Sequence, residues 1–306
     1  MIMAYLSTCD GVSVYYRDGG NPSGPPVLYL HGGPGEGSAD FEAFQDPYLR
    51  DTVRLVTLDQ RGALRSPPVN GTITLDQLLA DIEGLRTTLH IERWHVVGHS
   101  WGGWLASAYA SRYGDRVASV VLVCPALDWL DSIQSVVSRV AEMLAPHDPA
   151  LAARVRQYQA ELTADHPIWP TLAAIWSLVP GPVINAVYNP GLDTRPYAQW
   201  LTMALQQGQF TDADRARAKA VCEQLDWTLF QASGVADIQA YTGPVLLLMG
   251  EADPVCTRRQ QQAIAAGGGV TRWLPGGHKP FIECPDQFGD AVRAWVIAHA
   301  EPPRAV

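Results

Sequence analysis

The chain has 306 residues, 47% of them hydrophobic, and a formal net charge of −9. This length suits one core domain with a large insertion, and the hydrophobic content suffices for a buried core. An acidic chain without a basic cluster is not expected to bind nucleic acid or an anionic membrane surface. The five cysteines are odd in number and lack CxxC spacing, which favours reduced thiols over a disulfide framework or a zinc site.

The chain shows no sign of a targeting or membrane segment. The first residues lack a basic region followed by an apolar stretch, so we predict no secretory signal. No apolar run reaches the roughly 20 residues that a membrane helix requires. We therefore expect a soluble cytoplasmic protein without a membrane partner, and the sequence leaves the oligomeric state open.

Seven short apolar runs stand between turn signals and predict β-strands. The first alternates between apolar and polar residues, as an edge or antiparallel strand does. Several later runs are continuously apolar, as parallel strands covered on both faces are. The runs are Val12–Arg17, Val27–Leu30, Val53–Leu58, Trp94–Gly98, Ser119–Cys124, Val245–Met249 and Val270–Leu274.

Helical patterns fall between these runs. A stripe of leucine and isoleucine at helical spacing extends from Leu75 to Leu89, and Thr74 with Gln77 fits a capping box at its start. Helices are also predicted over Trp101–Arg112 and Gln287–His299. Strands that alternate with helices predict an α/β fold, in which a mostly parallel sheet is flanked by helices.

The alternation stops between Cys124 and Val245, where helical patterns and prolines replace the strands. The predicted helices there include Ser132–Leu144 and Pro149–Leu162. We interpret residues 126–236 as a helical cap inserted into a core of residues 1–125 and 237–306. Five of the ten tryptophans lie in this cap, where they form its own core or line a substrate pocket.

The pentapeptide Gly98-His99-Ser100-Trp101-Gly102 matches the pattern G-x-S-x-G. It follows a predicted strand and precedes a predicted helix, which is the context of a nucleophile elbow. The turn is strained and side chains beside the serine would collide, which explains the glycines. We therefore predict that Ser100 is the nucleophile of an α/β-hydrolase fold.

A serine nucleophile needs a base, and the base needs a carboxylate that orients it. In this fold the three groups follow one another along the chain as serine, acid and histidine. Asp253 and His278 each lie in a turn after an apolar run and are predicted to complete a triad with Ser100. Glu251 and Asp128 are the alternative acids.

Acyl transfer forms an oxyanion, which preorganised N–H groups must stabilise. One donor in this fold is the amide after the nucleophile, here that of Trp101. The other comes from a glycine-rich loop after an early strand, and the segment His31-Gly32-Gly33-Pro34-Gly35 has that position. We predict Gly33 as the second donor, with Gly32 as the alternative. This chemistry requires no metal or organic cofactor.

Three motifs together resemble the proline iminopeptidase family of α/β-hydrolases. They are HGGPG at 31–35, DQRG at 59–62 and the elbow at 98–103. The resemblance extends over the first 125 or so residues and more loosely over the last 65. It implies a helical cap and an enzyme that removes an N-terminal residue, often proline, from peptides or hydrolyses related amides and esters. Carried onto this chain, the catalytic residues are Ser100, Asp253 and His278.

The chain departs from the family pattern at Leu64, where the family usually has a glycine. Members of the family also hold the free amine of the substrate with carboxylates of the cap. For that role we name Glu223 and Asp226, which lie beside Trp227 late in the cap.

The main hypothesis is an aminopeptidase or amidase that acts on a small molecule or short peptide. The alternative is an esterase, lactonase or thioesterase, which we expect to have an apolar cap pocket without an amine-binding carboxylate. A ligand-binding protein without turnover is the third hypothesis.

Overall fold

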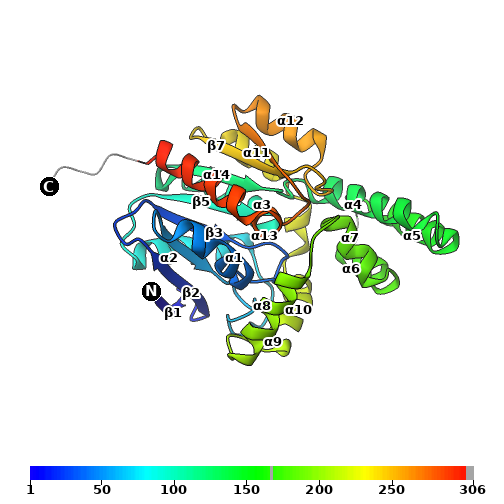
Figure 1. Ribbon diagram of the computed structural model, residues 1–306, viewed down its shortest axis with the longest axis horizontal. Helices are drawn as coiled ribbons and strands as arrows, with labels where there is room; N and C mark the ends of the chain where they lie inside the picture. Colours follow the sequence, from blue (N-terminus) through cyan, green and yellow to red (C-terminus); the bar gives the residue numbers. More distant parts are fainter. Residues whose placement is uncertain (166–167, 301–306) are drawn as a thin grey trace.

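A computed structural model describes residues 1–165 and 168–300, and an eight-stranded sheet runs through it (Figure 1). The spatial order of the strands is β1-β2-β4-β3-β5-β6-β7-β8. β2 is antiparallel to both of its neighbours, whereas β4, β3 and β5 to β8 are parallel. The prediction of a mostly parallel sheet is therefore confirmed. The strands are β1 (Ile2–Ser7), β2 (Ser13–Gly20), β3 (Pro26–Leu30), β4 (Arg54–Leu58), β5 (Trp94–His99), β6 (Val117–Val123), β7 (Val245–Gly250) and β8 (Val270–Leu274).

All seven predicted strands are present in the structure, with boundaries close to those predicted. The strand that the sequence pattern missed is β1, at the edge of the sheet. Three of its side chains, Ile2, Met3 and Tyr5, are apolar although they are exposed, and they lie on both faces of the strand. The strand therefore lacks the alternation of apolar and polar residues by which a half-buried strand is predicted.

Side chains of the central strands alternate between two apolar cores, one on each face of the sheet. Tyr29, for example, packs on Phe41 on one face, while its neighbours Leu28 and Leu30 face the other core. Helices α1 (Ala39–Leu49), α13 (Pro280–Glu283) and α14 (Pro285–Ala298) cover the first face. Helices α2 (Leu75–Thr88), α3 (Trp101–Arg112), α11 (Gly234–Ala240) and α12 (Arg258–Ala266) contribute to the second core.

Local sequence signals account for the helix boundaries. Thr74 caps α2, since its hydroxyl accepts a hydrogen bond from the Gln77 amide at 3.3 Å and its own amide donates to Gln77 Oε1 at 3.0 Å. This is the predicted capping box. The structure also confirms the predicted helices near Trp101–Arg112 and Gln287–His299. Helix α1 was missed because Pro47 interrupts its pattern.

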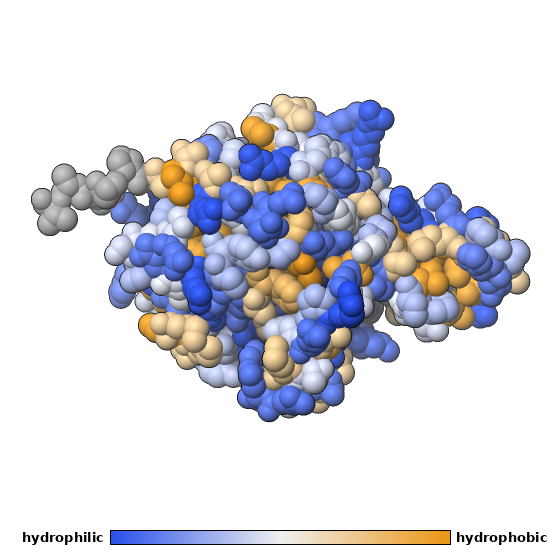
Figure 2. Space-filling view, viewed as in Figure 1, coloured by the Kyte–Doolittle hydropathy of each residue, from blue (hydrophilic) through white to orange (hydrophobic). Residues whose placement is uncertain are grey.

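Between β6 and β7 the described residues form helices and no strand. Helices α4 to α7 extend to one side of the sheet, and α8 to α10 lie below them in Figure 1. These helices are α4 (Trp129–Leu144), α5 (Pro149–Glu161), α6 (Ile168–Leu178), α7 (Gly181–Tyr188), α8 (Arg195–Gln206), α9 (Asp212–Ala216) and α10 (Ala218–Gln224). Figure 2 shows apolar residues on the lobe that α5 and α6 form. The exact limits of the cap remain a prediction.

None of the helices in the described part of the chain is by itself long and apolar enough to cross a membrane. Only α6 and α7 taken together have that length and composition, and they are bent by 116° relative to each other.

Candidate active site

The predicted nucleophile lies at a sharp turn between the central strand β5 and helix α3. Ser100 has φ 54° and ψ −117°, a conformation that non-glycine residues rarely adopt. The turn packs tightly, because a Cβ on Gly98 would lie 2.3 Å from the carbonyl oxygen of Gly102. A Cβ on Gly102 would lie 2.1 Å from that of Leu30. The glycines of the motif are therefore required by close backbone packing, and Ser100 faces a cavity.

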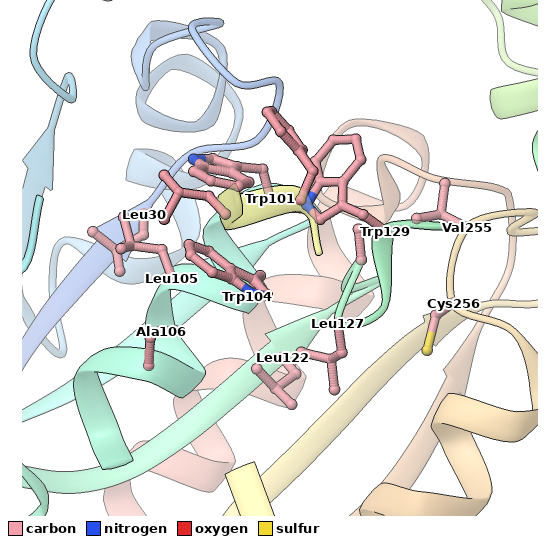
Figure 3. Packing of buried hydrophobic residues seen from close by; sticks show 14 of the residues in the cluster. Leu30, Trp101, Trp104, Leu105, Ala106, Leu122, Leu127, Trp129, Val255 and Cys256 are labelled. Carbon is pink, nitrogen blue, oxygen red and sulfur yellow. The ribbon is translucent and has the colours of Figure 1, made fainter. Parts of the chain in front are cut away.

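Aromatic packing supports the elbow from the side of α3. The indole ring of Trp101 stacks on that of Trp104, with 4.6 Å between the ring centroids. Trp129, in the first turn of α4, contacts Trp101 at 5.8 Å between centroids (Figure 3). The elbow is thus held between the second core of the sheet and the start of the cap.

His278 and Asp253 form a hydrogen-bonded pair at the carboxyl ends of β8 and β7. His278 Nδ1 donates to Asp253 Oδ1 at 2.7 Å, and the carboxylate of Asp253 is fully buried. Asp253 Oδ2 also accepts a hydrogen bond from the Cys256 amide at 2.8 Å. A proton on Nδ1 leaves Nε2 of the imidazole free to accept another.

The two alternative acids have other environments. Glu251 is exposed to solvent. Asp128 caps the N-terminus of α4 by accepting a hydrogen bond from the Asp131 amide at 3.1 Å, and it forms an ion pair with Arg259. Of the three carboxylates, Asp253 is the one that contacts the histidine, and the geometry favours it as the orienting acid.

The backbone of His278 is anchored to both the cap and the elbow. Its amide donates to the carbonyl of Tyr188 in α7 at 2.7 Å, and its carbonyl accepts a hydrogen bond from His99 Nε2 at 2.9 Å. Burial holds the pKa of His99 well below its ordinary value, so this ring is a neutral donor. Sequence reasoning did not identify Tyr188, because a backbone carbonyl leaves no sequence signal.

The glycine-rich loop after β3 passes directly beside the elbow. A Cβ on Gly32 would lie 3.1 Å from Ser100 Cβ and 2.8 Å from His99 Nδ1. Gly33 has φ 114° and lines the same cavity as Ser100. The amide of Trp101 lies in the first turn of α3, where a helix offers N–H groups no internal acceptor. Trp101 thus follows the predicted nucleophile directly, Gly33 lines the same cavity, and Gly32, the alternative donor, packs against Ser100.

The DQRG turn connects the loop and the elbow. The Gln60 amide donates to His31 Nε2 at 3.0 Å, and the Gln60 side chain donates to the His31 carbonyl at 3.1 Å. Gln60 Oε1 accepts a hydrogen bond from Trp101 Nε1 at 2.9 Å. Burial lowers the pKa of His31, which suits its role as a neutral acceptor. One glutamine therefore joins all three motifs that carry the family resemblance.

A buried ion pair stabilises the same turn. Asp59 accepts hydrogen bonds from the Ser38 amide at 2.7 Å and from Arg65 Nε at 2.7 Å. Burial opposes ionisation of Asp59, but Arg65 more than offsets it and lowers the pKa to about 2. Leu64, just before Arg65, has φ 42°. This left-handed conformation explains why the family usually has a glycine there, since glycine adopts it without strain.

A cavity of about 820 Å³ lies between the sheet and the cap. Ser100, His278 and Gly33 form part of its wall, and the cap supplies mainly apolar and aromatic side chains. Cap tryptophans that line it are Trp129, Trp169 and Trp176. These three therefore match the interpretation of the cap tryptophans as pocket residues.

The structure does not bring the two predicted amine-binding carboxylates to this cavity. Glu223 is exposed, and its carboxylate lies 3.8 Å from the ammonium of Lys219. Asp226 accepts a hydrogen bond from the Thr228 amide at 3.0 Å and so caps a short 3-10 helix. Among the described residues, the carboxylate side chain in the cavity wall is that of Glu36.

The described residues contain one group with the spacing of metal donors, which is Cys124 with Asp253 and His278. Burial raises the pKa of the Cys124 thiol well above its ordinary value, and its sulfur accepts a hydrogen bond from the Gly250 amide at 3.3 Å. Asp253 and His278 are bonded to each other. This group therefore fits a buried thiol beside a hydrogen-bonded aspartate–histidine pair better than a metal centre.

Several curated relatives are proline iminopeptidases. That of Xylella fastidiosa is 48% identical over 121 residues, 38% of this chain and 37% of the relative. That of Neisseria gonorrhoeae is 43% identical over 122 residues, 39% of this chain and 38% of the relative. The resemblance inferred from the motifs is confirmed, and the matched part spans less than two-fifths of the length of these relatives.

Solved structures show the same fold over nearly the whole chain. A proline iminopeptidase of Mycobacterium smegmatis has a TM-score of 0.69 at 20% identity, with 97% of this chain and 98% of that chain covered. An enol-lactonase of Burkholderia xenovorans LB400 has a TM-score of 0.67 at 20% identity, with 96% and 100% covered. The profile of the alpha/beta hydrolase fold matches residues 25–285. With its strand order, its elbow and this match over most of its length, the chain belongs to the α/β-hydrolase fold family.

Proposed function

We propose that this protein is a serine hydrolase that releases an N-terminal residue from a small peptide or amide. The observation that carries the proposal is the hydrogen bond of 2.7 Å between His278, which lines the cavity that Ser100 faces, and the buried Asp253. A serine at a strained elbow, a histidine with its proton on Nδ1 and a buried carboxylate are the parts of an acyl-transfer triad.

In the proposed mechanism, His278 Nε2 takes the proton of Ser100 as the serine oxygen attacks the acyl carbon. Asp253 holds the imidazole in the required tautomer and stabilises its charged form. The amides of Gly33 and Trp101 stabilise the oxyanion, an effect of about 3–4 kcal/mol per donor in related enzymes. His278 then protonates the leaving amine, and a water molecule releases the acyl group from Ser100.

The choice of an amide substrate is supported by the relatives. The similarity at 42–48% identity is to proteins named proline iminopeptidase or probable proline iminopeptidase, and the HGGPG and DQRG segments lie beside the nucleophile in this structure. The matched segment spans only part of each relative, 37% in that of Xylella fastidiosa. The activity of these relatives therefore supports the proposal as an analogy.

An esterase, lactonase or thioesterase is the second candidate, and the character of the cavity favours it. The walls that the cap supplies are mainly apolar, and the single carboxylate described in the lining, Glu36, forms an ion pair with Lys279 at 3.1 Å. A neutral acyl chain would bury apolar surface there, which stabilises binding in proportion to the area removed from water.

A hydrolysis panel tests both candidates. It pairs aminoacyl p-nitroanilides, including those of proline and alanine, with p-nitrophenyl esters of short neutral acids. We expect turnover of the aminoacyl compounds, with a lower rate when their amine is acetylated. Turnover of the esters alone, with no effect of a free amine, would favour the second candidate. A fluorophosphonate probe that labels the wild type and not Ser100→Ala would identify the nucleophile in either case.

A further inference from the structure

Glu36 projects into the cavity beside the proposed oxyanion donor. It follows Gly33 by three residues, and a Cβ on Gly33 would lie 2.9 Å from the Glu36 nitrogen and 3.2 Å from Glu36 Cγ. The side chain therefore runs alongside Gly33, and 43% of it is accessible. Glu36 thus lines the same cavity as Ser100 and lies close to Gly33, the proposed oxyanion donor.

The charges around Glu36 do not cancel. The ammonium of Lys279 lies 3.1 Å from Glu36 Oε2 and 3.1 Å from Asp40 Oδ2, so one cation faces two carboxylates. Enclosure by the protein opposes ionisation of Glu36, but Lys279 overcomes this effect, and the pKa of the carboxyl lies below its ordinary value. At neutral pH this group of three side chains carries one excess negative charge.

Two further cations lie near this group, and each has a carboxylate of its own. Arg215 lines a neighbouring cavity with Glu36, Asp40 and Lys279, and it lies 3.4 Å from Asp212. Lys219 lines the cavity that Ser100 faces, but its side chain is largely exposed and lies 3.8 Å from the carboxylate of Glu223. Asp253 adds a further negative charge behind His278. Water reaches part of the Glu36 side chain and screens its charge, but the apolar walls on the other sides leave the attraction for a bound cation stronger than in bulk water.

We infer that Glu36 binds a positively charged amine on the acyl part of the substrate and so selects aminoacyl substrates over neutral ones. The inference rests on the proposed function, since it names the substrate class of the same site. The α-amine of an aminoacyl group is separated from its carbonyl carbon by one atom, so the group that binds it must lie in the same part of the cavity as the oxyanion donor, and Glu36 lies beside Gly33. The hydrogen bond to Lys279 uses Oε2, and a carboxylate has capacity for further donors.

Ligand binding tests this inference without any turnover. The ligands are L-prolinamide, which is cationic at neutral pH, and tetrahydrofuran-2-carboxamide, in which oxygen replaces the ring amine. Affinities are measured by calorimetry, and we expect the wild-type protein to bind prolinamide more tightly than tetrahydrofuran-2-carboxamide. Glu36→Gln is expected to weaken prolinamide binding about tenfold to a hundredfold and to leave the neutral ligand within about twofold. Equal affinity of the wild type for both ligands would overturn the inference.

Further variants separate charge from folding. Glu36→Asp keeps the charge and is expected to retain a preference for prolinamide, and thermal denaturation checks that both variants fold. Glu142→Gln removes an exposed carboxylate on α4 outside the cavity wall and serves as the matched control, with unchanged binding. A preference for prolinamide that survives Glu36→Gln but is lost in Glu223→Gln or Asp226→Asn would assign the amine site to the cap and refute the role of Glu36.

Kinetics distinguish failure of this inference from failure of the proposed function. For Glu36→Gln we expect KM for an aminoacyl p-nitroanilide to rise about tenfold or more, while kcat/KM for p-nitrophenyl butyrate stays within about twofold. Ester hydrolysis that requires Ser100, without a Glu36-dependent preference for the cation, would refute the inference and leave a serine hydrolase. A Glu36-dependent preference in binding without any hydrolysis would support the inference and refute the enzymatic function.

Discussion

Gln60 Oε1 accepts a hydrogen bond from the indole Nε1 of Trp101 at 2.9 Å, and through this contact the DQRG turn is attached to the nucleophile elbow. The same side chain donates to the carbonyl of His31, at the start of the glycine-rich loop. The position of the loop relative to Ser100 therefore depends on a residue that is proposed to take no part in the chemistry.

We predict that Gln60→Leu destabilises the protein and lowers kcat. The substitution leaves the buried Trp101 N–H and the His31 carbonyl without partners, at a cost of about 1–3 kcal/mol for each group in the free energy of unfolding. Urea denaturation measures this cost. Gln239→Leu is the control, because Gln239 is exposed and donates one hydrogen bond to the Ala263 carbonyl, so we expect a change within about 0.5 kcal/mol. Equal effects of the two substitutions would contradict the proposed link.

Replacement of the proposed nucleophile should abolish turnover without loss of the fold. We expect Ser100→Ala to lower kcat by at least about a thousandfold on whichever substrate the wild type hydrolyses. The variant should also fail to react with a fluorophosphonate probe. Because alanine lacks only the hydroxyl, its circular dichroism spectrum should match that of the wild type. Retention of full activity in Ser100→Ala would exclude the proposed mechanism.

The pairing of Asp253 with His278 predicts a large kinetic effect of a small substitution. Asp253→Asn keeps the shape of the side chain but removes the charge and favours the wrong tautomer of the imidazole. A loss of about 10⁴ in kcat is expected, as for the equivalent change in serine proteases. Glu251→Gln, two residues away and exposed, should leave kcat nearly unchanged. If Glu251→Gln were the more damaging variant, the orienting acid would have to be reassigned.

The buried Asp59–Arg65 pair predicts acid sensitivity. The pKa of Asp59 is about 2 in the folded protein, below the value of 3.8 for an ordinary aspartate. Its contribution to stability is therefore complete above about pH 4 and is lost as the pH falls toward 2, by about 2 kcal/mol. Urea denaturation at pH 4 and at pH 2 measures this loss. The difference in the free energy of unfolding between the two pH values should be smaller for Asp59→Asn than for the wild type.

Asp193 provides the control for this effect. Arg195 also lowers the pKa of Asp193, but that ion pair is exposed to solvent. Because water and salt screen this pair, we expect Asp193→Asn to change the difference in the free energy of unfolding between pH 4 and pH 2 much less than Asp59→Asn does. If both substitutions reduced the acid sensitivity of the protein equally, the burial of the Asp59–Arg65 pair would not explain that sensitivity.

Local sequence patterns determined much of this protein. Seven strands, the capped helix α2 and the elbow at Ser100 follow from apolar periodicity, a capping box and glycine spacing. Each of these signals depends on residues that are close along the chain, so it can be read without knowledge of the fold. Asp253 and His278 were predicted from the turns that follow their strands, together with the order in which triad residues occur along the chain in this fold.

The tertiary structure alone decided which residues from distant parts of the chain meet. The ammonium of Lys279 and the carboxylate of Glu36 meet across 243 positions, and no local pattern marks their pairing. The resemblance implied carboxylates in the cap that bind an amine, but Glu223 and Asp226, chosen for that role, lie outside the cavity wall. Local spacing determined which groups could react, whereas packing of the cap on the sheet decided which charges face the substrate, because that packing brings together side chains from distant segments.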